Sequence, residues 1–270
     1  MTASLLRTTR ITVRDYIANI APILLRFGYE YRSVWKAQLV RDLIDRLLYL
    51  FAFGFGMGAL VKTMDGLPYL DFLVPGIAAS TGVFVMTMAM TYGVWERSTS
   101  YKLYPAWLAT PVRLPQVLMA ELLYASLRTL PSILILFLLA GLWLKAIPSF
   151  WGALLALPVL MLANLAFGAI AMCFTVHIYR PLHFAYVNTL WTTPMFLFSG
   201  VFFDLSHAPA PLYWLSQCLP LTHVIGLVRP LMTGQDLSAV SVLVDLGVLV
   251  TIFAVGYSYA CYRFQKRLLD

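Results

Sequence analysis

Long apolar runs follow one another along the chain, separated by short polar intervals. A helix needs roughly 20 mostly apolar residues to cross the hydrocarbon core of a bilayer. Six runs come near that length, and none has room for a soluble loop inside it. They cover residues 42–61, 72–94, 117–144, 150–174, 184–203 and 240–262. The pattern predicts an all-α integral membrane protein with six transmembrane helices.

The N-terminal forty residues are too polar to span, yet their apolar positions recur at helical spacing. A basic amphipathic helix beside a membrane lies in the headgroup plane. We therefore expect residues 1–40 to form a cytoplasmic, interfacial segment and residues 41–270 to form the six-helix transmembrane domain. Pro22 is expected to divide the helix. The candidate interfacial residues are Arg26, Arg32, Trp35 and Lys36. A passive anchor and a lever moved by a cytoplasmic partner both remain open.

The first span begins with four charges. Arg41 and Asp45 stand four residues apart, as do Asp42 and Arg46. Residues at this spacing are neighbours on a helix surface. Pairing would lower the cost of bringing these charges to the membrane boundary. We expect these two pairs to anchor the first span.

The loop between the second and third spans has a helical pattern of its own. Tyr104, Trp107 and Leu108 share one face, Pro105 suits a first turn and Pro111 a stop. This predicts one short amphipathic helix with exposed aromatic side chains, which is typical of a docking surface. The candidate docking residues are Glu96, Arg97, Tyr104, Pro105, Trp107, Leu108, Thr110, Pro111 and Arg113.

Two charges lie inside the third span. Glu121 and Arg128 are seven residues apart and share a helix face. Charges at this depth usually face a bundle interior or a water-filled path. We expect Glu121 to be the partner of Arg128, with Asp245 as the more distant choice. Contact with a substrate is the alternative to structural pairing.

The region between the fifth and sixth predicted spans holds four prolines and an apolar stretch too short to cross. Residues 212–219 lie between Pro211 and Pro220. Such a stretch favours an external re-entrant or interfacial helix. Its aromatic residues, Tyr213 and Trp214, suit the membrane interface.

Composition and charge agree with a membrane class. The chain is 61% hydrophobic and 11% charged, against about 45–50% and about 25% in soluble domains. Of the 19 basic residues, 14 fall in the N-terminal segment, the loops after the second and fourth spans, and the tail. By the positive-inside rule both termini are cytoplasmic. The net charge of +7 is thus a topology signal and not a sign of nucleic-acid binding.

Several kinds of chemistry are disfavoured. Gly54 and Gly58 lie in a span without a following Gly-Lys-Ser/Thr, so they fit helix packing and not a phosphate loop. The three cysteines are scattered, and no metal-ligand motif occurs. A stand-alone membrane enzyme acting on lipid or glycan at the outer face stays as the alternative function. It would use Asp204, His207 and His223.

Five short segments resemble one family in their order and spacing. They read Leu-Val-Pro-Gly-Ile at 73–77, Leu-Ala-Thr-Pro-Val at 108–112, Thr-Pro-Met-Phe-Leu-Phe-Ser-Gly-Val-Phe-Phe at 193–203, Leu-Pro-Leu-Thr-His at 219–223 and Val-Arg-Pro-Leu at 228–231. With Glu121, they resemble type-2 ABC transporter permeases, and the last three are similar to the nodulation protein J branch. The resemblance covers nearly the whole chain after about residue 30.

The resemblance implies a transporter subunit and no enzyme. Two copies of this chain would form a homodimer and bind two ATP-binding cassette ATPase subunits, which hold ATP and Mg, so this chain binds no cofactor directly. The helix around 105–111 would be the coupling helix, and residues 209–219 would form the external re-entrant helix. Substrates in this branch include lipo-oligosaccharides, while relatives export drugs, polysaccharides or other lipids. The expected location is the bacterial cytoplasmic (inner) membrane, in contact with membrane lipid.

Overall fold

The computed structural model describes residues 13–206 and 208–269. Almost every element in this part is helical, as predicted. Four of its helices are long and apolar enough to cross a membrane. They cover Tyr69–Ser100, Leu114–Trp143, Phe150–Thr175 and Ala239–Arg267. These correspond to the second, third, fourth and sixth predicted spans.

The central helix of the bundle is α5 (Phe150–Thr175), which packs against α2 (Tyr69–Met88), α4 (Leu114–Leu138) and α10 (Ala239–Leu269). Small residues let these helices approach closely. A Cβ on Gly82 of α2 would lie 2.0 Å from Oδ1 of Asn164 on α5. Asn164 in turn donates to the Thr129 hydroxyl of α4, at 2.6 Å. The bundle core is thus fixed by close backbone contact and a buried hydrogen bond.

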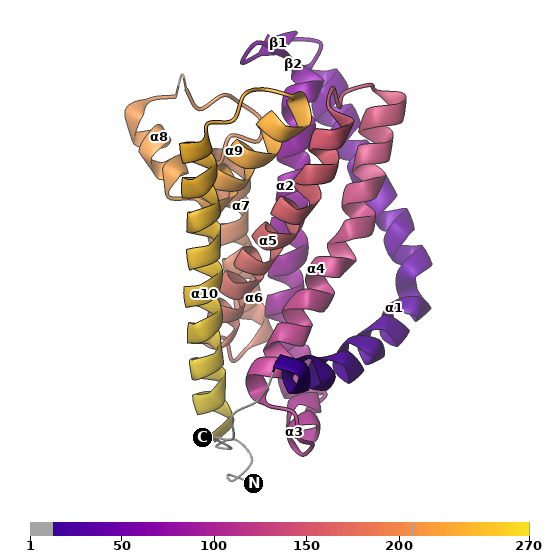
Figure 1. Cartoon of the computed structure of the whole chain (residues 1–270), viewed down its shortest axis with the longest axis vertical. Coiled ribbons are helices and arrows are strands. Elements are labelled where there is room, and N and C mark those ends of the chain that lie inside the picture. Colours follow the sequence, from indigo (N-terminus) through magenta and orange to yellow (C-terminus); the bar gives the residue numbers. More distant parts are fainter. Residues whose placement is uncertain (1–12, 207, 270) are drawn as a thin grey trace.

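The N-terminal segment and the start of the first predicted span form one helix, α1 (Val13–Tyr49), which continues as the π-helical η1 (Leu50–Met57). Figure 1 shows α1 lying across one end of the bundle and then turning to run along α4. The prediction that Pro22 divides this helix is wrong. Pro22 lies on the exposed face of α1. A proline has no N–H to donate to the carbonyl group one turn earlier, but here that carbonyl is not buried among apolar side chains.

The fifth predicted span is a shorter chain of helical pieces. They are η5 (Pro181–His183), α6 (Phe184–Val187), η6 (Asn188–Thr192) and α7 (Thr193–Phe198). The helix ends at Phe198, and Gly200, two residues later, takes a positive φ of 79° and turns the chain. These pieces therefore do not form one long apolar helix of the kind found in the other four spans. The first predicted span is also not among the four long apolar helices. Its reason is composition, because four charges cluster at its start.

The two ends of the bundle differ in structure (Figure 1). At the α3 end lie the start of α1, the short α3 (Leu103–Leu108) and the C-terminal end of α10. Here α2 is extended by η2 (Ala89–Gly93) and η3 (Glu96–Ser100). At the opposite, hairpin end, α4 is extended by η4 (Leu139–Trp143).

The hairpin end takes its name from β1 (Thr63–Met64) and β2 (Leu67–Pro68), which pair antiparallel. Their two-residue turn is Asp65-Gly66, with φ angles of 50° and 71°. Asp-Gly favours such a turn because both positions need a positive φ. The sequence analysis did not predict this hairpin, which is too small to change the helical class.

The region after the fifth predicted span forms two helices where one was predicted. They are α8 (Ala210–Gln217) and α9 (Pro220–Thr233). The missed helix, α9, packs back onto α2 and α5 with Leu221, Val224 and Val228 fully buried. Arg229 of α9 donates hydrogen bonds to the backbone carbonyls of Gly200 at 2.7 Å and Phe72 at 3.2 Å, and these bonds hold α9 against the bundle. Pro220 opens α9, in the first-turn position that a proline tolerates.

Candidate functional site

A buried ion pair joins two of the long helices at the α3 end. Arg97 of η3 donates from Nε to Oε1 of Glu121 at 2.7 Å, and from Nη2 to Oε2 at 2.5 Å. Glu121 of α4 is 0% exposed. Two parallel hydrogen bonds between a guanidinium and a carboxylate fix both position and orientation. The pair therefore holds the end of the α2–η3 helix against the start of α4.

The loop helix α3 contributes to the same site. The Tyr104 hydroxyl donates to Oε1 of Glu121 at 3.4 Å, and its side chain is fully buried. Burial, followed by the Glu121 carboxylate, raises the pKa of Tyr104 well above its usual range. The hydroxyl thus stays protonated and remains a donor. As a result, α3 is attached to the ion pair and does not move as a free loop.

Aromatic rings link α1 to this pair. The Phe27 ring stacks on Tyr124 of α4 with centroids 4.6 Å apart and meets Trp107 of α3 edge-on at 5.9 Å. The Arg97 guanidinium lies 5.3 Å from the Phe27 centroid, within range of a cation–π attraction. Arg26 lies 5.2 Å over the Trp107 ring.

We call this group the junction. It consists of Arg26, Phe27, Arg97, Tyr104, Trp107, Glu121 and Tyr124. Phe264 of α10 borders it, with its ring 6.3 Å from that of Tyr104. Four segments distant in sequence therefore meet in one set of contacts. Through it, α1 and α3 contact both the end of the α2–η3 helix and the start of α4.

A polar cleft opens beside the junction. Arg26, Tyr29, Glu30, Glu96, Arg97, Tyr101 and Leu103 line it. The Tyr101 hydroxyl donates to Glu96 at 3.1 Å. Charges of both signs face this opening, so it offers hydrogen-bonding groups to a protein surface.

Two predictions about charged and aromatic residues here are wrong. Glu121 pairs with Arg97 and not with Arg128, because the helix that continues from α2 through η3 brings Arg97 beside Glu121. Arg128 lies instead near Tyr124 and near Tyr31 of α1. The aromatic side chains of α3 are not freely exposed either, since α1 covers Trp107 and Tyr104 is buried.

The other predicted docking residues surround the junction without entering it. Thr110 caps the end of α3 by donating to the Trp107 carbonyl at 2.6 Å. Arg113 is the N-cap of α4, and its backbone N–H donates to Oε1 of Gln116 at 2.8 Å. Pro105 and Leu108 belong to α3, and Pro111 follows it. These residues shape the loop that carries α3.

The remaining interfacial residues are spread along α1. Arg32, Trp35 and Lys36 are exposed, and the Lys36 ammonium lies 5.8 Å over the Trp35 ring. At the hairpin end, Tyr213 and Trp214 of α8 are also exposed, with 69% of Trp214 accessible. Their exposure suits an interface with headgroups or water.

Two of the three residues of the alternative enzyme, Asp204 and His223, are described, and each is engaged in other contacts. His223 is occupied on both ring nitrogens, by Asp245 Oδ1 at 2.7 Å from Nδ1 and by the Gln217 carbonyl at 3.1 Å from Nε2. The backbone N–H of Ser206 donates to Asp204 at 2.9 Å. His207 lies outside the described residues. Within the described part of the chain, no three His, Cys, Asp or Glu side chains gather as a metal site would require.

Sequence reasoning missed three contributors to the site. Phe27 carried a signal, as an apolar position in the amphipathic period of α1. Tyr124 and Phe264 carried none, since aromatic residues are common in membrane helices.

Comparison with known proteins gives one consistent result. The family model described as "ABC-2 type transporter" matches residues 27–233. Nodulation protein J of Rhizobium meliloti (strain 1021) is 29% identical over 259 residues, covering 90% of this chain and 95% of that protein. Nodulation protein J of Sinorhizobium fredii (strain NBRC 101917 / NGR234) is 31% identical over 241 residues, covering 87% and 90%. That of Rhizobium leguminosarum bv. viciae is 29% identical over 259 residues, covering 90% and 96%.

Proposed function

This chain belongs to the ABC-2 type transporter family, and we propose that it is the permease subunit of an exporter driven by a separate ATPase chain. Members of this family are membrane subunits of transporters. We further propose that the substrate is moved outward, away from the cytoplasm. The substrate is an amphiphile, such as a lipo-oligosaccharide, another lipid-linked glycan or a drug.

The permease crosses the membrane six times. Four crossings are the long apolar helices. The other two are the ascending part of α1 with η1, and the pieces from α6 to α7. Arg97, Lys102 and Arg113 support a cytoplasmic position for the α3 end, because this end carries basic residues. The external re-entrant element is then α8 with its continuation α9.

The junction is the observation that carries the coupling role. The ATPase docks at the α3 end, against α3 and the first turns of α1, with the polar cleft as part of its contact. Movement of α3 is passed to α2 and α4 through Tyr104 and the Arg97–Glu121 pair. The family relationship further supports a homodimer of permeases with two ATPase subunits.

Coupling can be tested with a matched pair of tryptophan variants. The chain is co-purified with an ATP-binding protein encoded beside it and reconstituted in liposomes. Trp107→Ala should weaken co-purification or uncouple ATP hydrolysis from transport, because the ring connects α3 to α1. Trp214→Ala, at the hairpin end, should leave both unchanged. Equal effects of the two variants, or none from Trp107→Ala, would contradict the coupling role.

A further inference from the structure

Besides Arg97, an arginine in the last turn of α1, Arg46, is also buried. Arg46 is 7% exposed, and its Nε has no hydrogen-bond partner among the described residues. It borders a small cavity of about 10 Å³ between α1, α2 and α7. The cavity is lined by Tyr49, Ile77, Ser80, Phe84 and Phe196 as well. An incompletely satisfied guanidinium is costly at this depth, so the site requires an explanation.

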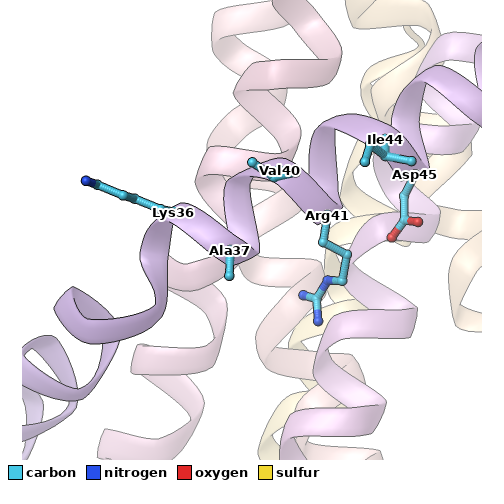
Figure 2. A pocket seen from close by; sticks show the side chains of 6 residues that line it. All are labelled: Lys36, Ala37, Val40, Arg41, Ile44 and Asp45. Atoms are coloured by element: carbon cyan, nitrogen blue, oxygen red, sulfur yellow. The ribbon is translucent and has the colours of Figure 1, made fainter.

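The nearby carboxylates do not satisfy it. Asp42 and Asp45 attract Arg46 electrostatically, yet the ion pairs of the described chain do not include it. Asp42 accepts the Ser132 hydroxyl of α4 and pairs with Arg41 at 3.4 Å. Asp45 lines a hollow on the outer side of α1 together with Arg41, as Figure 2 shows. The predicted pairing of Asp42 with Arg46, and of Arg41 with Asp45, is therefore wrong.

Two other arginines that lie mostly inside the bundle have hydrogen-bond acceptors within the described part of the chain. Arg97 has the two oxygens of Glu121, and Arg229 has two backbone carbonyls and the Phe72 ring at 3.6 Å. Burial of an arginine in this protein therefore comes with hydrogen-bond acceptors. Arg46 faces hydroxyl groups and aromatic rings in their place.

We propose that Arg46 is a binding site for the anionic headgroup of an amphiphile, such as a phosphate, sulfate or carboxylate. A guanidinium matches such groups with two parallel hydrogen bonds. The Tyr49 hydroxyl supplies a further donor, while the Ser80 hydroxyl already donates to the Gly76 carbonyl at 2.7 Å. The Phe84 and Phe196 rings, 5.0 Å apart, contact the apolar portion.

The cavity as it stands holds about one water molecule, so the anion binds as α1 separates from α7. This separation is possible because α1 packs chiefly on α4, while its contacts with α7 are sparse. Both ring pairs on the cavity wall, Tyr49 with Phe196 and Phe84 with Phe196, meet edge-on and can part without breaking hydrogen bonds.

A basic route leads to the site. Lys36, Arg41 and Arg46 follow at intervals of five residues and wind from the outside of α1 into the bundle. Lys36 is exposed, the Arg41 side chain is 61% exposed, and Arg46 is buried. An anionic headgroup at the membrane surface would meet them in that order. A role for this site in transport rests on the proposed function, whereas binding itself does not.

The test uses the purified full-length chain in dodecyl maltoside and dodecyl phosphate as the probe. Thermal unfolding is followed as dodecyl phosphate is added. The parent should gain stability in a saturable way. In Arg46→Gln the apparent affinity should fall about tenfold or more, the effect of losing hydrogen bonds to a charged group. Arg32→Gln, at an exposed arginine of α1 outside the basic route, is the matched control and should stay within about twofold. Equal losses in both variants, or no saturation, would overturn the proposal.

Two further measurements identify the kind of ligand. Inorganic phosphate should stabilise the parent far less than dodecyl phosphate, and an equal effect would overturn the assignment to an amphiphile. Phosphatidylcholine vesicles are then compared with and without phosphatidylglycerol. A stabilisation by phosphatidylglycerol that Arg46→Gln abolishes supports the site with a membrane lipid as its ligand. Its absence, with dodecyl phosphate still binding, supports the transported substrate as the ligand.

A folding defect can be separated from a binding defect. Without any anion, Arg46→Gln should unfold at the same temperature as the parent or higher, because it removes a poorly satisfied buried charge. A lower unfolding temperature would mean that Arg46 has a structural partner and would overturn the proposal. These measurements need no ATPase, so a failure of the coupling experiment leaves them valid, and the reverse is also true.

Discussion

Arg97 lies in η3 and Arg46 in the last turn of α1. Both are largely shielded from solvent, yet their surroundings differ. Arg97 makes two hydrogen bonds to Glu121 and lies beside the Phe27 ring. Arg46 borders a small cavity with its Nε unpaired in the described part of the chain. The first charge has its partner in the protein. The second lacks a partner for its Nε among the described residues, and in our proposal that partner comes from outside the protein.

The difference teaches how a membrane protein uses its few charges. A buried pair adds little net stability over apolar residues of the same size, but breaking it leaves one charge without compensation. The Arg97–Glu121 pair therefore fixes geometry where α2, α3 and α4 meet. An unpaired charge does the opposite, since it lowers stability until a ligand binds. The same residue type thus serves structure at one site and, in our proposal, recognition at the other.

Removal of Glu121 should have the largest effect. Glu121→Ala leaves Arg97 buried without its carboxylate, so the free energy of unfolding should fall by about 3–5 kcal/mol. Denaturant unfolding in detergent measures this loss. The double variant Arg97→Met/Glu121→Leu should recover most of it, because no charge is left unpaired. If the double variant is as unstable as Glu121→Ala, packing and not charge pairing determines the junction.

Removal of the other arginine should act in the opposite direction. Arg46→Leu takes away a poorly satisfied buried charge, and the free energy of unfolding should rise by up to about 1–2 kcal/mol without added anion. The same unfolding assay measures the change. A loss as large as that of Glu121→Ala would erase the contrast between the two sites.

The hydroxyl of Tyr104 should contribute less. Tyr104→Phe removes one hydrogen bond to Glu121 and should cost about 1 kcal/mol near neutral pH. Burial raises the pKa of Tyr104 in the folded protein, so its hydroxyl favours folding below the ordinary tyrosine pKa of 10.0. Above that pH the parent loses this contribution and Tyr104→Phe does not. Unfolding measured at pH 7 and above pH 10 should show the difference shrinking, and a difference that grows would contradict it.

The exposed charge should matter least. Arg41 pairs with Asp42 at 3.4 Å, but its side chain is largely in solvent. Arg41→Gln should change the free energy of unfolding by less than about 1 kcal/mol. An effect as large as that of Glu121→Ala would show that exposure does not separate these sites.

Much of the helical layout could be predicted from the sequence. The runs at 72–94, 117–144 and 150–174 are close to helices of the structure because a helix is the simplest way to satisfy backbone groups in a bilayer. The loop helix was also recognised, from the spacing of Tyr104 and Trp107. Local rules failed at Pro22, whose exposed position tolerates an unpaired carbonyl, and at α9, whose prolines looked like interruptions.

The sequence by itself determined the membrane class, most helical runs and the identity of the few intramembrane charges, because length and hydropathy are local properties. The tertiary structure alone decided which charges meet. Arg97 and Glu121 come from different helices, and Glu121 and Arg128, which share one, remain apart. Such pairing depends on the angle and depth at which helices cross. It also depends on the bend of α1 that brings Phe27 to the junction and turns Arg46 into the bundle.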